Sequence, residues 1–187
     1  MNRTVSFTTL DRATQEDLEI IDDCFKDQVK SLKKRIIEAL LGLRGNPMGY
    51  QIDRFEHSLQ TATRALRDGC DDEMIVCALL HDLGDDLAPL NHGELAAAIL
   101  RPYVSPENAW TVKHHGILQS KEYLHEMKVD KNELEKKLRN HPAFERTIIF
   151  CRRWDRVSFD PNYDSLPLST FEPMLERIFS HKVNCLS

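Results

Sequence analysis

Histidine and aspartate residues recur along this 187-residue chain at positions that suit metal binding. The most distinctive are His81 and Asp82, which follow an apolar run over residues 74–80 and precede Gly84. Neighbouring side chains on a helix point about 100° apart, so they do not stack, but they can converge on a metal ion lying against the helix end. A neutral imidazole and a carboxylate suit divalent first-row metals. The pair alone does not establish a metal site; residues of matching chemistry on either side of it are needed as well.

Four further residues with the same chemistry fall on consecutive helical segments around this pair. Side chains that project inward from facing helices are how bundle proteins build metal sites. Four imidazoles and two carboxylates can hold two metal ions if one carboxylate bridges, and Asp82 is the natural bridge because it is central in the order. Such ligation suits iron, manganese, cobalt or zinc and leaves positions for water, oxygen or substrate. The four residues are His57, His92, His115 and Asp155.

Each of these residues has an ordinary alternative explanation when taken singly. His92 follows Asn91 at a helix start, where a solvated residue is common, and Asp155 has arginine neighbours with which it could form a surface ion pair. His114 and His115 are adjacent, so only one of them easily faces inward. Six candidates in order on successive helices nevertheless favour a metal site over coincidence.

Apolar residues spaced by three and four predict the amphipathic helices that position these side chains. Ser105 and Pro106 give a strong helix start, with serine as N-cap and proline at the first helical position. We find no strand-like alternation, so the sequence predicts an all-α fold. We expect an N-terminal arm and helix over residues 1–49 and the main domain, with a C-terminal helix, over 50–187. The expected helices cover residues 15–43, with a possible break after Cys24, and 52–67, 72–83, 92–100, 106 onward, 131–139, 142–157 and 171–179.

Composition narrows the classes of partner. The net charge is −5 with no sustained basic stretch, which argues against nucleic acid and leaves a small molecule as the expected ligand. Five cysteines without a CxxC pair, and no signal peptide, indicate a reduced, cytoplasmic chain. No apolar stretch approaches the roughly 20 residues needed to span a bilayer. We expect a monomer or homodimer.

The order His, His-Asp, His, His, Asp resembles that of the HD-domain metalloproteins, over roughly residues 50–163. The sharpest parts are residues 57–62 and 79–84. The resemblance implies a single HD-domain helical bundle with an N-terminal helical extension. Most of that superfamily are phosphohydrolases of nucleotides or cyclic dinucleotides. A smaller branch comprises diiron oxygenases: myo-inositol oxygenase, and bacterial enzymes that cleave the C–P bond of 1-hydroxyphosphonates. His-Ser-Leu-Gln at residue 57 and Ala-Leu-Leu-His-Asp-Leu-Gly at residue 78 resemble the phosphonate enzymes.

By this resemblance the metals would be two irons in a mixed-valent Fe(II)/Fe(III) pair, with O2 as co-substrate. His81 and Asp82 would be the catalytic residues. His115 is chosen over His114 because the family's ligand directly precedes a small-residue turn, here Gly116. The implied ligands are His57, His81, Asp82 and Asp155 for the first iron, and His92 and His115, with Asp82 bridging, for the second.

Oxygenase and hydrolase are the two main alternatives. Many dinuclear hydrolases of the family follow His-Asp-x-Gly with a lysine that holds phosphate, whereas here Asp85 and Asp86 follow. Two carboxylates beside the metals would repel a phosphate monoester and favour a cationic group, such as an amine or trimethylammonium on a 1-hydroxyphosphonate. We therefore favour the oxygenase; a phosphohydrolase and a non-catalytic regulatory domain are the alternatives. Candidate substrate-binding residues are Tyr50, Asp53, Asp85, Asp86, Gln119 and Lys121.

Overall fold

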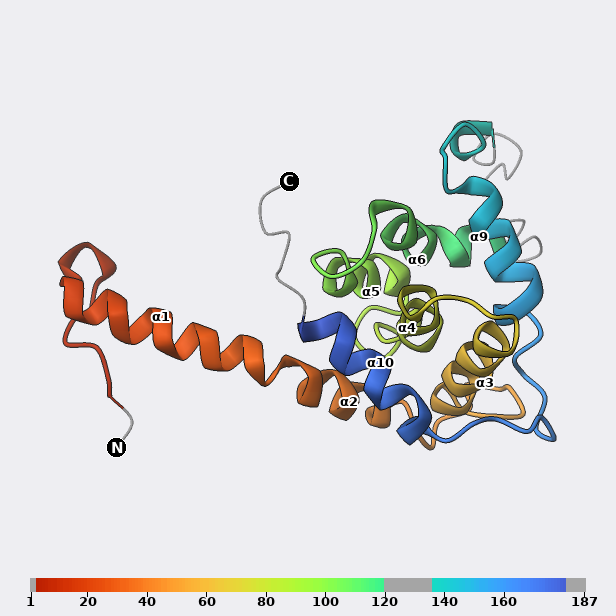
Figure 1. Ribbon diagram of the computed structural model, residues 1–187, viewed down its shortest axis with the longest axis horizontal. Coiled ribbons are helices and arrows are strands. Elements are labelled where there is room, and N and C mark those ends of the chain that lie inside the picture. Colours follow the sequence, from red (N-terminus) through yellow and green to blue (C-terminus); the bar gives the residue numbers. More distant parts are fainter. Residues whose placement is uncertain (1–2, 120–135, 181–187) are drawn as a thin grey trace. The chain divides into compact units, whose positions relative to one another are not determined.

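The computed structural model describes residues 3–119 and 136–180, and none of these residues forms a β-strand. The all-α prediction is therefore confirmed (Figure 1). The elements are η1 (Leu10–Arg12), α1 (Gln15–Lys30), α2 (Leu32–Gly42), α3 (Arg54–Arg67), α4 (Asp72–Leu80), α5 (His92–Leu100), α6 (Pro106–Gln119), α9 (Phe144–Phe150), the π-helical turn η2 (Cys151–Asp155) and α10 (Leu168–Ser180).

The chain divides into two compact units, Met1–Ile37 and Glu38–Ser187. The boundary expected at residue 49 from the sequence remains a prediction. The long helix expected over residues 15–43 is two helices, α1 and α2, separated at Ser31. Helix α1 begins with a capping box, in which the Thr14 side chain accepts the backbone N–H of Asp17 and the Asp17 carboxylate accepts that of Thr14.

Helix α4 is the central helix of the second unit. Residues 74–80 are all buried, and the helix packs against α3, α6 and α10. Its start is fixed by Asp71, whose carboxylate accepts the backbone N–H of Met74 at 2.8 Å. The helix ends at Leu80 rather than at residue 83 as expected, because the chain then folds into turns in which Leu83 N–H bonds to Leu80 and Asp85 N–H bonds to Asp82. His81 and Asp82 thus lie at the buried end of the core helix.

The helices around α4 bring distant parts of the sequence to that end. Helix α3 packs against both α4 and η2, and α6 packs against α5, α9 and η2. The helix expected from Pro142 begins at Phe144 and changes to π geometry at Cys151. Most of the helix expected over residues 131–139 lies outside the described residues.

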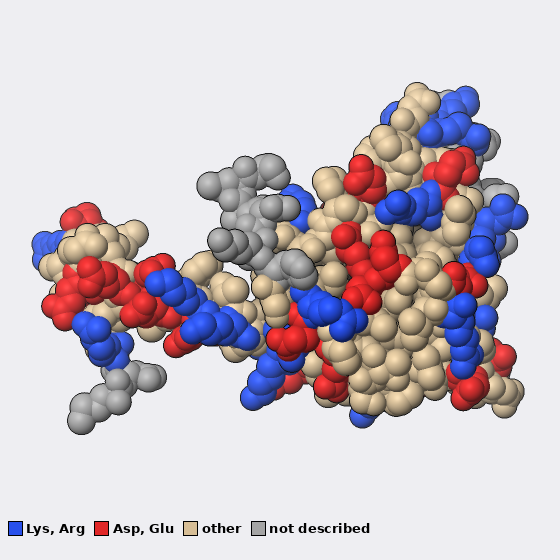
Figure 2. Space-filling view, in the orientation of Figure 1, with Lys and Arg blue, Asp and Glu red and all other residues tan. Residues whose placement is uncertain are grey.

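The exposed surface carries mixed charge. On the face of the second unit shown in Figure 2, basic and acidic side chains are interspersed. Among the described residues, no helix is both long and apolar enough to cross a membrane.

Candidate metal centre

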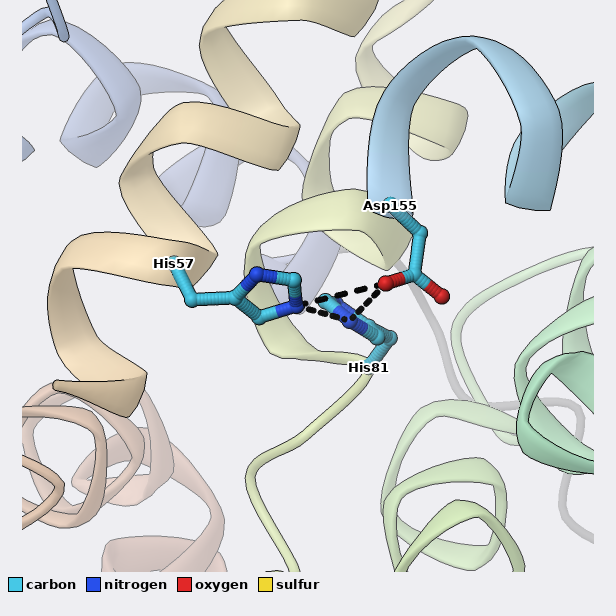
Figure 3. A group of neighbouring side chains, drawn as sticks. All are labelled: His57, His81 and Asp155. Carbon is cyan, nitrogen blue, oxygen red and sulfur yellow. Dashed lines mark hydrogen bonds and ion pairs between the residues drawn. The ribbon is translucent and has the colours of Figure 1, made fainter. Parts of the chain in front are cut away.

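Six of the sequence-predicted ligands converge on one buried cluster. His57 projects from α3, His81 and Asp82 from the end of α4, and Asp155 from the end of η2. Figure 3 shows His57, His81 and Asp155 pointing toward one another from these three elements. The cluster is completed by His92 at the start of α5 and His115 in α6.

All four imidazoles turn Nε2 toward the cluster, and in three of them Nδ1 is anchored by a hydrogen bond. Three Nδ1 atoms lie 2.6–2.8 Å from backbone carbonyl oxygens, those of Ser158, Ala78 and Val112. Because a carbonyl oxygen only accepts hydrogen bonds, these Nδ1 atoms carry the proton, and Nε2 of the neutral ring is left bare. Anchoring the outer nitrogen in this way is what metal-binding histidines do. The histidines so held are His57, His81 and His115; Nδ1 of His92 instead faces the Asp85 carboxylate at 3.1 Å.

The bare nitrogens face one another at short range. His57 Nε2 lies 3.1 Å from His81 Nε2, and His92 Nε2 lies 3.2 Å from His115 Nε2. Two nitrogen lone pairs at this distance repel unless a proton or a metal ion lies between them. Ligands about 2.1 Å from a metal are separated by about 3.0 Å at octahedral angles and about 3.4 Å at tetrahedral angles. The spacing therefore fits donors that share a cation.

The two carboxylate oxygens of Asp82 face different pairs of imidazoles. Oδ2 lies 3.4 Å from Nε2 of both His57 and His81. Oδ1 lies 3.4 Å from Nε2 of His92 and 3.2 Å from that of His115. This divides the cluster into a four-donor subsite, made of His57, His81, Asp155 and Asp82 Oδ2, and a three-donor subsite, made of His92, His115 and Asp82 Oδ1.

Asp155 closes the four-donor subsite and owes its position to the π-helical turn. Its Oδ1 lies 3.3 Å from His57 Nε2 and 3.7 Å from His81 Nε2. Asp155 is buried, and its Oδ2 has no hydrogen-bond partner among the described residues. An orphaned buried carboxylate oxygen is costly unless a cation compensates it. The donor set therefore fits a metal ion.

The electrostatics of the cluster also favour a bound cation. Burial raises the pKa of Asp82, but the neighbouring imidazoles, His81 first, hold it well below its usual range. Burial lowers the pKa of His57, but hydrogen bonds to Asp155 and Asp82 outweigh burial and raise it to about 9. Both carboxylates are thus ionised at neutral pH, and without a metal they hold a proton on His57.

Arg54 is a member of this site that the sequence reasoning missed. Its Nε lies 2.8 Å from Asp85 Oδ2, and its Nη1 lies 3.5 Å from Asp82 Oδ2. Its side chain is only 16% exposed. Arg54 stands three residues before His57, and residues three apart share one face of a helix. That spacing is the signal that could have identified it.

Aromatic rings cover one side of the four-donor subsite. The ring of Phe159 stacks on that of His57 with centroids 4.3 Å apart, and Tyr50 stacks on Phe159 at 4.7 Å. The guanidinium of Arg54 lies 4.8 Å from the Tyr50 ring centroid. Tyr50, predicted to bind substrate, therefore lies on the outside of this cover and is 43% exposed.

The other predicted substrate-binding residues differ in their contacts and burial. Asp53 caps α3, because its two carboxylate oxygens accept the backbone N–H groups of Glu56 and Gly45. Gln119 ends α6, and its backbone carbonyl accepts a hydrogen bond from Arg156. Asp86 is exposed, whereas Asp85 is buried against Arg54 and His92. Lys121 lies outside the described residues.

The choice between the adjacent histidines 114 and 115 can now be compared with the structure. His115 is 2% exposed and faces Asp82, whereas the His114 ring packs on Trp110 at 4.1 Å. The reason given for that choice is wrong, however, because Gly116 lies inside α6 and not in a turn.

Comparison with known proteins identifies the domain. The sequence model described as "HD domain" matches residues 54–158, which is more than half of the chain and includes all six candidate ligands. No curated protein sequence matches the chain.

Proposed function

The chain belongs to the HD domain family, and on that premise we propose that it is a diiron oxygenase that uses O2 to cleave a C–P or C–C bond of a small hydroxylated substrate. Membership of this family implies a metal-dependent hydrolase or oxygenase, and the buried His/Asp cluster provides metal ligands. The oxygenase chemistry, the iron and the substrate class are the proposal.

The observation that carries the two-metal part of the proposal is the position of Asp82. Its two oxygens face separate imidazole pairs at 3.2–3.4 Å, which is how a carboxylate bridges two ions. A single ion in the four-donor subsite would leave Oδ1 and the two imidazoles facing it without a cation.

The two subsites differ in burial and in the number of protein donors, so we propose different roles for them. The four-donor subsite is completely buried, whereas the three-donor subsite includes His92, whose side chain is 24% exposed. Fewer protein donors and greater exposure leave positions there for substrate oxygens and for O2. Two irons, when bound, would supply oxygen binding and one-electron chemistry; the protein supplies orientation, charge and exclusion of water.

The residue after Gly84 supports the oxygenase over the hydrolase. At the position where many dinuclear hydrolases carry a phosphate-binding lysine, Asp85 is buried and paired with Arg54. Because the Asp85 charge is compensated within the chain, Asp85 neither attracts a cationic substrate nor repels a phosphate, and the absence of the lysine is what favours the oxygenase. We therefore propose a hydroxylated substrate and no longer propose that it carries an amine or trimethylammonium group.

The test is iron reconstitution of metal-free protein under anaerobic conditions, followed by partial oxidation and low-temperature EPR. We expect about two irons per chain, a coupled mixed-valent signal, a change in that signal with 1-hydroxyphosphonates or inositols, and substrate-dependent O2 uptake. His115→Ala should abolish the coupled signal, whereas His114→Ala, its neighbour outside the cluster, should retain it.

Two results would refute the oxygenase. One is a protein that binds two metals but shows no O2 uptake with any hydroxylated substrate and releases phosphate from phosphoesters without oxygen. That result would assign the chain to the phosphohydrolases. The other is a single bound metal at saturation, which would refute the dinuclear site itself.

A further inference from the structure

His92 differs from the other three histidines of the cluster in what holds it. Their Nδ1 atoms are anchored by backbone carbonyls, two of which, those of Ala78 and Val112, lie three residues earlier in the chain. His92 Nδ1 instead lies 3.1 Å from Asp85 Oδ1. The orientation of this one ring therefore depends on a side chain from a separate turn.

Asp85 lies on the side of the His92 ring that faces away from the other donors. Nε2 of His92 faces Asp82 and His115, while Nδ1 faces Asp85. Asp82, Asp85 and His92 each offer a ligand atom within 4.8 Å of one another, but the His92 nitrogen that pairs with Asp85 is Nδ1, whereas the nitrogen that faces His115 is Nε2. This geometry assigns Asp85 to the support of His92 and not to direct ligation.

Arg54 in turn fixes Asp85. Its Nε forms an ion pair with Asp85 Oδ2 at 2.8 Å, while Asp85 Oδ1 faces His92 Nδ1 at 3.1 Å, so the two Asp85 oxygens face different residues. The guanidinium also approaches the bridging carboxylate of Asp82 at 3.5 Å. Both partners are nearly buried, with side-chain exposures of 16% for Arg54 and 4% for Asp85. An ion pair held away from solvent restricts the positions that both side chains can adopt.

We propose that the Arg54–Asp85 pair positions His92 and thereby sets the affinity of the three-donor subsite for the second metal ion. Both residues are positioning residues that act through His92 and Asp82. The inference rests on the two-metal part of the proposed function and is independent of whether the reaction is an oxygenation.

A consequence is that the two metals bind in order. The four-donor subsite has backbone-anchored rings and one more donor, so it fills first. The three-donor subsite fills second, and its affinity responds to changes at Asp85. A change at Arg54 acts mainly there, through Asp85, and more weakly on the four-donor subsite, because Arg54 Nη1 also lies 3.5 Å from Asp82 Oδ2. Loss of a partner that orients a metal-binding histidine typically weakens metal affinity by about 10- to 100-fold.

The experiment compares metal binding by four full-length proteins: wild type, Asp85→Asn, Arg54→Lys and Asp86→Asn. Asparagine has one acceptor oxygen, so it can serve His92 or Arg54 but not both. Lysine keeps the charge of Arg54 but lacks the fork that reaches both carboxylates. Asp86→Asn makes the same charge change at the exposed neighbouring residue. Metal-free protein is dialysed against Co(II) at graded concentrations, bound cobalt is counted by elemental analysis, and unfolding temperatures are recorded.

We expect wild type to bind two cobalt ions, and Asp86→Asn to bind each of them with the same affinity as wild type does. Asp85→Asn should bind the first ion as wild type does and the second about 10- to 100-fold more weakly. Arg54→Lys should weaken the second ion more than the first, since Arg54 pairs with Asp85 at 2.8 Å and approaches Asp82 Oδ2 only at 3.5 Å. Unchanged second-ion affinity in both variants would overturn the inference. Equal weakening of both ions with a lower unfolding temperature would also overturn it, since that is the signature of a general structural role. A wild type that binds one ion would instead refute the proposed function.

Discussion

Gly84, the glycine that follows the His-Asp pair, lies so close to the start of α5 that a methyl group does not fit. A Cβ built on Gly84 would lie 2.7 Å from the carbonyl oxygen of His92, 3.0 Å from its Cα and 3.1 Å from Leu95 Cβ. The two closest atoms belong to backbone, which cannot swing away as a flexible side chain would. Gly84→Ala should therefore push the start of α5, and with it His92, away from the cluster.

The expected size of this effect follows from the contact distances. Ordinary contact begins at 3.4 Å, so the backbone of His92 must move by 3.4 less 2.7 Å, or about 0.7 Å. Overpacking of this kind costs about 1–3 kcal/mol. For a chain of this length, each kcal/mol lowers the unfolding temperature by about 2–4 °C, so we expect a fall of roughly 2–12 °C.

The assay is thermal unfolding of the metal-free protein, followed by Co(II) binding. Gly42→Ala is the matched control, because a Cβ there meets no atom within 4 Å. The control should unfold at or slightly above the wild-type temperature, since alanine stabilises helices relative to glycine. Gly84→Ala should also bind the second ion more weakly. An unfolding temperature at or above that of wild type for Gly84→Ala would refute the close-contact reasoning.

Three further predictions concern single residues. Asp155→Asn should remain helical by circular dichroism but lose the ion of the four-donor subsite, so that bound cobalt at saturation falls from about two to about one per chain; two retained ions would contradict this. Gln60 holds both backbone groups of Asp160, through Nε2 at 2.7 Å and Oε1 at 3.3 Å. Gln60→Ala should lower the free energy of unfolding by about 1–3 kcal/mol, measured by denaturant unfolding. Gln60→Glu should lower it at least as much, because it places a buried carboxylate oxygen against the Asp160 carbonyl oxygen; equal stability of all three proteins would exclude this role. The pKa of Asp17 is lowered to about 2 by the backbone N–H groups of Ser6 and Thr14. The ionised Asp17 carboxylate stabilises the start of α1. This stabilisation is fully present above about pH 3.9, the pKa of an aspartate in the unfolded chain, and it is lost as the pH falls toward 2. NMR titration should show loss of the Ser6 and Thr14 amide signatures over that range in wild type and their absence at all pH values in Asp17→Ala.

The sequence was most informative where structure depends on neighbouring residues. The apolar spacing and capping residues identified the described helices, including the start of α6 at Pro106 and the whole of α5 (His92–Leu100). Helix ends were less predictable: α4 stops at Leu80, where the chain folds into hydrogen-bonded turns that present Asp82 to histidines of α3 and α6. The π-helical turn before Asp155 has no signal in the apolar spacing.

For the metal centre, the sequence alone supplied the residue types and their order, because ligand chemistry is a property of each side chain. Only the tertiary structure decided how they are used. It placed the two oxygens of Asp82 toward different imidazole pairs and turned Asp85 from a free carboxylate into the partner of Arg54 and His92. The physical reason is that burial and pairing depend on residues far apart in the chain: Arg54 and Asp85 are 31 positions apart in the sequence, and their atoms lie 2.8 Å apart in the fold.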